Sequence, residues 1–103
     1  MAYAPKIVLH CPYGYRMELN ALVEHFLVDG VKFVGVVGAD CELVEDIIDE
    51  IVVGDGKDPS RFILTSAHPG ESIDDVVKFA RQLTDLGESD AQVVALDMRP
   101  HRL

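Results

Sequence analysis

The chain has 103 residues and a mass of 11.3 kDa, which is enough for one compact domain and too little for two hydrophobic cores. Hydrophobic residues make up 49% of it, a share that excludes a wholly disordered chain. Its 18 acidic and 9 basic residues give a net charge of −9, and a field of that sign repels phosphate backbones and acidic lipid surfaces. We therefore expect neither nucleic acid nor a membrane as a partner.

The N-terminal half of the chain predicts a strand, a helix, a second strand and a second helix. The short apolar run Ile7–Leu9 is typical of a buried parallel strand. Apolar residues at helical spacing then predict a helix over 17–28, and the run 31–37 predicts the next strand. Asp40 is expected to cap a helix over 41–53, which has a wide apolar face.

The C-terminal half repeats this alternation. The run 61–65 predicts a third strand. Ser72 is followed three residues later by Asp75, a spacing that resembles a capping box, and the apolar spacing then predicts a helix over 73–83. The run 91–96 predicts a fourth strand, so the elements alternate along the whole chain.

The order βαβαβαβ predicts a single three-layer, doubly wound α/β domain with a four-stranded parallel sheet. Such a domain is flavodoxin-like or Rossmann-like, truncated by at least one strand. We expect the strand order 2-1-3-4. Right-handed crossovers would then place the first helix alone on one face, with the second and third helices on the other.

Ligands in such sheets bind beyond the carboxyl ends of the strands, where the strand order reverses. With the order 2-1-3-4, that position lies between the first and third strands. Its loops would be formed by residues 10–16 and 65–72, with Asp97, Arg99 and His101 following the fourth strand. The candidate ligand-binding residues are Cys11, Tyr13, Arg16, Ser66, His68 and Ser72, and the candidate catalytic residues among them are Cys11, Arg16 and His68.

Cys11 is a candidate nucleophile because a thiol between a strand and a helix can have a lowered pKa, and Arg16 could bind an anion beside it. The segment 11–16 resembles the phosphate loop of low-molecular-weight tyrosine phosphatases and the phosphocysteine loop of sugar-phosphotransferase IIB domains. It departs from the phosphatase pattern, because four residues rather than five separate Cys11 from Arg16, and Pro12 removes one amide. A buried structural cysteine is the favoured interpretation.

The loop after the third strand allows a different chemistry. Its hydroxyls and the amides that open the next helix would suit a small anion such as phosphate. Ser66, His68 and Glu71 could also form a Ser-His-Glu relay, although structural roles in capping and turn formation are favoured. Cys and His residues do not occur at metal-ligand spacing, so we expect no metal and no other cofactor.

Two functions from different classes therefore stay open. The favoured one is a small, non-catalytic α/β module in the cytoplasm that acts by association as a homodimer or with a protein partner. The alternative is a domain that binds a small anionic ligand, or a cysteine-dependent enzyme, using the loops after the first and third strands. We expect the partner to cover an open half-face over the third and fourth strands, because both strands carry apolar residues on both faces, such as Phe62 and Val94.

Overall fold

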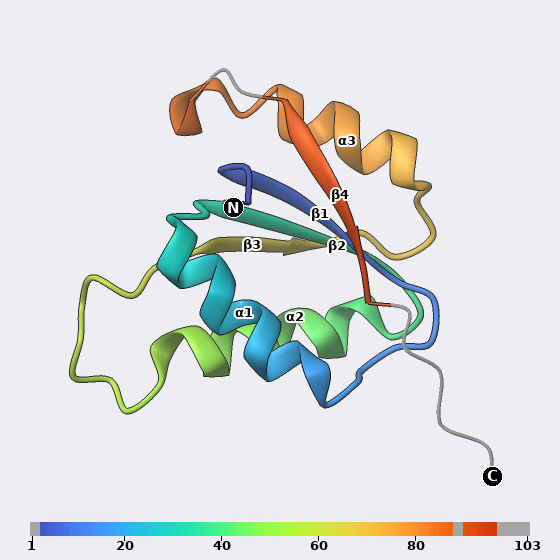
Figure 1. Ribbon diagram of the computed structural model, residues 1–103. Helices are drawn as coiled ribbons and strands as arrows, with labels where there is room; N and C mark the ends of the chain where they lie inside the picture. Colours follow the sequence, from blue (N-terminus) through green and yellow to red (C-terminus); the bar gives the residue numbers. More distant parts are fainter. Residues whose placement is uncertain (1–2, 88–89, 97–103) are drawn as a thin grey trace, which may run out of the picture.

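The computed structural model describes residues 3–87 and 90–96, which form a small α/β domain (Figure 1). The predicted α/β class and the predicted alternation of elements are confirmed. In chain order the elements are β1 (Lys6–Cys11), α1 (Glu18–Asp29), β2 (Phe33–Gly38), α2 (Cys41–Val53), β3 (Leu64–Ala67), α3 (Ile73–Arg81), a short 3₁₀ helix, η1 (Thr84–Leu86), and β4 (Ala91–Ala95).

The order of the strands differs from the prediction. The described residues form one parallel sheet of four strands in the order β3-β2-β1-β4, so the predicted order 2-1-3-4 is wrong. Burial explains the difference. Nearly all residues of β1 and β2 are buried, whereas every described residue of β3 and β4 is exposed or half-buried. The two strands that are buried on both faces therefore occupy the centre of the sheet.

The strand order determines on which face of the sheet each helix lies. The first two crossovers step in one direction along the sheet and the third steps back, so right-handed connections put α1 and α2 on one face and α3 on the other (Figure 1). The predicted grouping of the second and third helices on one face is thus wrong. The topological switch point, which was predicted between the first and third strands, lies between β1 and β4.

Two cores of different size lie on the two faces of the sheet. The larger core, between the sheet and the helices α1 and α2, is built from alternate strand residues and from the buried stripes of both helices: Ile7, Leu9, Leu19, Val23, Phe26, Val34, Val36, Val44, Ile48 and Val52. The smaller core lies under α3 and contains Val8, Phe33, Val37, Val76 and Ala80. Gly35 permits that close packing, since a Cβ there would lie 3.0 Å from side-chain atoms of both Phe33 and Val76.

The ends of the helices and strands match the predicted ends in part. Ser72 and Asp75 form the expected capping box, in which each side chain accepts from the backbone N–H of the other residue. Asp40 lies directly before α2 but makes no side-chain cap, because its backbone is left-handed with φ of 53°. The third strand begins at Leu64 rather than at residue 61. Arg61 instead donates to the carbonyl oxygens of Ile51 and Val52 at the end of α2.

The assembly surface expected over the third and fourth strands does not exist as one surface. The strands β3 and β4 lie at opposite edges of the sheet, with β2 and β1 between them, and α2 packs against β3 on the face where the first helix was expected to lie alone. The C-terminal segment 97–103, expected beside that surface, lies outside the described residues, as do the candidates Asp97, Arg99 and His101.

Candidate functional site

The six candidate residues do not converge on one crevice. Those in the loop after β1 and those near the end of β3 are separated by the whole width of β2, a spacing of about 10 Å across two strand intervals. The switch point lies between β1 and β4; the loop after β1 is described, whereas the segment after β4 lies outside the described residues. The loop after β1 and the loop after β3 are therefore two separate candidate sites.

Cys11 has the environment of a structural cysteine. It is fully buried in the larger core, where Cys41 is also buried, and both cysteines are free thiols. Burial, with a smaller contribution from Cys41, raises the pKa of Cys11 from its ordinary value of 9.0 to about 12. A nucleophilic cysteine needs the opposite shift, because the thiolate is the reactive form. The favoured interpretation of Cys11 from the sequence thus agrees with its surroundings.

Tyr13 and Arg16 interact with each other beside Cys11. The guanidinium carbon of Arg16 lies 5.6 Å from the centroid of the Tyr13 ring, and Nη1 donates to the carbonyl oxygen of Tyr15 at 3.3 Å. Gly14 between them has φ of 75° and packs against Ala39 and Asp40, so the loop after β1 rests on the loop after β2. These contacts do not aim Arg16 at the buried sulfur, as a phosphate loop would require.

Ser66 of β3 and two residues of the loop after it form a chain of three hydrogen-bonded side chains. The Oγ of Ser66 lies 2.7 Å from Nε2 of His68, and Nδ1 of His68 lies 3.1 Å from Oε2 of Glu71. We call this chain the relay. The His68 side chain is only 7% exposed, and its ring makes an edge contact with Phe79 of α3 at a centroid distance of 4.9 Å. The imidazole is therefore fixed in one orientation, and both of its nitrogens have partners.

The amides around the relay are already used by the protein. The backbone N–H of His68 donates to the carbonyl oxygen of Val36, and that of Glu71 donates to the carbonyl oxygen of His68. Ser72, the remaining candidate in this loop, uses its hydroxyl as the cap of α3. These groups are thus committed to holding the loop, which is the structural role that the sequence favoured.

A cavity of about 400 Å³ lies between the loops that follow β2 and β3. Its walls are formed by Gly38, Asp40, Cys41, Glu42, Leu43, Pro69 and Gly70. Asp40 and Glu42 give this cavity a negative charge, and no Lys or Arg is among its lining residues. That charge opposes a phosphate ligand here, although the amino terminus of α2 is close by.

Of the side chains near the outer edge of β3, sequence reasoning named Phe62 as part of a partner surface and missed the others. Phe62, Leu64 and Phe79 are 64%, 43% and 39% exposed, and we call these three side chains the apolar patch. Phe33 connects two of them, because it pairs with Leu64 in the sheet and its ring lies 6.0 Å from that of Phe79. Phe62 lies two residues before the start of β3 and is separated from Leu64 by the buried Ile63.

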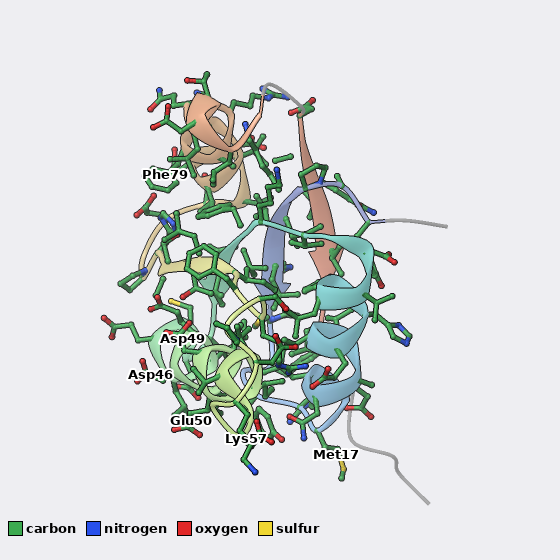
Figure 2. All side chains as sticks on the ribbon, turned by 90° about the vertical axis from the view of Figure 1, so that its left-hand side faces the viewer. Met17, Asp46, Asp49, Glu50, Lys57 and Phe79 are labelled. Carbon is green, nitrogen blue, oxygen red and sulfur yellow. The ribbon has the colours of Figure 1, made fainter. Side chains whose placement is uncertain are left out.

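Acidic side chains line the other side of the same edge. The Thr65 hydroxyl lies 3.0 Å from Oε2 of Glu45 and 2.7 Å from Oδ1 of Asp49. Figure 2 shows Asp46, Asp49 and Glu50 of α2 together on the side of the molecule that also carries Phe79. The acidic helix was visible in the sequence, but its position beside β3 depends on the strand order.

Comparison with known proteins places the chain in a family. The model of a family described as a domain of unknown function, DUF7684, matches residues 13–102, and the chain belongs to that family. No curated protein and no solved structure matches it. Within the described residues, no group of three or more His, Cys, Asp or Glu side chains could hold a metal ion. No helix in that part of the chain is long and apolar enough to cross a membrane.

Proposed function

We propose that the domain is an association module, which binds a protein partner along the β3 edge. The apolar patch carries this proposal. Three large apolar side chains, two of them aromatic, are exposed at or near β3 on a domain with a net charge of −9. Exposed apolar clusters beside polar surroundings are typical of interaction sites, and aromatic residues are enriched in them. We place the protein in a reducing compartment such as the cytoplasm, which suits its two free thiols.

Site-specific photo-crosslinking tests this proposal. A photoreactive phenylalanine analogue replaces Phe62 in cells that produce the protein, and the same analogue replaces Val28 in the control. Val28 is 84% exposed but belongs to α1 on the opposite face. A crosslinked product of defined mass at position 62 and not at 28 is expected. Equal labelling at both positions, or none at position 62, would contradict an interaction site at the patch.

Light scattering on the purified chain separates the two kinds of partner. A dimer at micromolar concentration that dissociates when Phe62 is replaced by Ser would identify the partner as a second copy. A monomer, together with a crosslink at position 62, would identify a different protein. Either result supports association at the β3 edge, whereas a monomer without a crosslink overturns it.

The relay supports a second candidate function, acyl transfer at Ser66. A serine hydroxyl hydrogen-bonded to a histidine that is oriented by a carboxylate is the arrangement that activates a serine nucleophile. The Ser66 oxygen would attack the carbonyl carbon of an ester while its proton moves to Nε2 of His68. That proton would pass to the departing alcohol, and water would later hydrolyse the acyl-serine. Association is favoured over this candidate because the nearby amides of His68 and Glu71 are bonded within the protein and cannot stabilise an oxyanion.

A fluorophosphonate probe, which labels activated serines covalently, tests the second candidate. Labelling of the native chain that is lost in Ser66→Ala and in His68→Ala would support it. The variant Ser72→Ala is the matched control, because it removes a neighbouring hydroxyl that bonds only to the backbone of α3. An unlabelled native chain, or labelling that survives in Ser66→Ala, would leave the relay with a structural role alone.

A further inference from the structure

Among the described residues, no strand pairs with the outer edge of β3. This strand pairs with β2 on one side, and the amides of Leu64 and His68 donate inward to the carbonyl oxygens of Lys32 and Val36. Backbone groups alternate in direction along a parallel strand, so those of Thr65 and Ala67 point outward. Edge strands are usually protected by a short length, a lysine, a proline or a bulge; β3 is short, with four residues, but contains neither a lysine nor a proline. The edge can therefore accept a further strand.

The two sides of this edge differ in chemistry. The side facing α3 carries the apolar patch, with Leu64 and Phe79 next to the strand. The side facing α2 carries Glu45 and Asp49, both in contact with Thr65. The helix α2 contains no Lys or Arg between Cys41 and Val53. In Figure 2, Phe79 lies above the edge and the acidic residues of α2 lie below it.

Thr65 is the hydrogen-bond donor between the two carboxylates on this acidic side. A hydroxyl group has one proton, so Thr65 can donate to Glu45 or to Asp49 but not to both at once. The other carboxylate is left to solvent or to a donor from a partner, since Asp49 is exposed and Glu45 is half-buried. A Lys or Arg side chain supplied by a partner would satisfy both carboxylates and reduce the like-charge repulsion along α2.

We propose that the β3 edge binds an extended segment of a partner protein in which basic and apolar residues alternate. An added strand presents successive side chains to opposite faces of the sheet, so apolar residues would meet the patch and basic residues would meet Glu45 and Asp49. This inference rests on the proposed association function and specifies its partner. A second copy of the chain fits this edge poorly, because pairing β3 with its own copy would bring two acidic α2 helices together.

Titration with synthetic peptides tests the proposal. The probe is a peptide of alternating Lys and Val, and amide chemical shifts of the labelled protein report where it binds. One control peptide has Glu in place of Lys, and another has the same composition with all Lys residues in one block. We expect only the alternating Lys peptide to bind, with shifts concentrated in β3 and α2 and with affinity that falls as salt is added.

Two variants separate the contributions of charge and backbone. The variant Glu45→Gln/Asp49→Asn is expected to weaken peptide binding about fivefold, as the loss of two exposed ion pairs implies. Glu18→Gln/Asp85→Asn removes the same charge from distant exposed positions and should leave the affinity within about twofold. Ala67→Pro removes an outward N–H at an edge position that tolerates proline, and should abolish binding without unfolding the domain, as circular dichroism would verify.

The outcomes distinguish a failure of this inference from a failure of the proposed association function. The proposed partner chemistry would be overturned if the Glu peptide, or the peptide with all Lys residues in one block, bound equally well. Chemical-shift changes centred on β4 would overturn it too. If photo-crosslinking at position 62 succeeds while no peptide binds, association stands and the alternating basic segment is wrong. If neither experiment gives a signal, both proposals fail.

Discussion

The buried thiol of Cys11 predicts that the domain loses stability in alkaline solution by an amount that can be calculated. The pKa of Cys11 is about 12 in the folded state, against an ordinary value of 9.0. The folded protein therefore retains this proton to a higher pH than the unfolded chain does. The stabilisation is complete below about pH 9 and falls as the pH rises toward about 12, by about 1.4 kcal/mol for each pH unit. Its full size is on the order of 4 kcal/mol.

Urea unfolding of the native chain and of Cys11→Ala, at a series of pH values from about 8 to about 11, measures this contribution. Most other groups that titrate in the same range affect both proteins equally, so the difference in unfolding free energy reports Cys11 together with its interaction with Cys41. We expect that difference to shrink above about pH 9 and then to change sign, because the variant has no thiol to ionise. Cys41→Ala is the control, since it keeps the Cys11 thiol and should retain most of the pH dependence. Parallel pH profiles for the native chain and Cys11→Ala would refute the reasoning.

Four further predictions concern the unfolding free energy of variants and the reactivity of Cys11. At neutral pH, Cys11 in the folded chain should react with a thiol reagent no faster than a free cysteine does, and rapid, phosphate-protected labelling would contradict its burial. Lys6→Met should raise the free energy of unfolding by about 1–4 kcal/mol, because Nζ of Lys6 is buried without a hydrogen-bond partner among the described residues; a loss would show that the charge is paired. Ser72→Ala should cost about 1 kcal/mol and speed hydrogen exchange in the first turn of α3, and unchanged exchange would contradict the cap. Gly38→Ala should cost more than Gly30→Ala in urea unfolding, because a Cβ at Gly38 would lie 2.5 Å from the Cys11 carbonyl oxygen while that at Gly30 meets open space, and equal losses would contradict this packing.

The elements of the fold could be predicted because their signals are local. The apolar spacing of α2 and the turn-rich segment that follows it place the helix at Cys41–Val53 in both the sequence and the structure. The capping box of α3 is equally local, since it needs only Ser72 and Asp75. The order of the strands is a different kind of property, because it depends on which strands can be buried on both faces. Thr65 and Ser66 indicated an edge position for β3, and that signal was not used.

The candidate site was harder to predict because its contacts cross the chain. The proximity of Ser66 and His68 follows from their spacing on one strand face, but the orientation of the imidazole needs Phe79 from α3. The contacts of Thr65 with Glu45 and Asp49 need α2 to pack beside β3. The high pKa of Cys11 likewise depends on burial beneath α1 and α2. Local sequence patterns singled out Cys11, Ser66 and His68, but their burial and their contacts depend on the tertiary structure.

The strand order also determines which chemistries can be combined. With β2 between them, the loop after β1 and the loop after β3 cannot close on one small ligand, so Cys11 and His68 cannot share a substrate. The apolar patch, the acidic side chains of α2 and the relay all lie along β3, where one bound segment would contact more than one of them. Ser66→Ala separates their roles, because it removes the relay hydroxyl and leaves the outward backbone groups and both flanking surfaces in place. Unchanged peptide binding in this variant would show that the edge works through its backbone and flanks, and that the relay serves to hold the loop.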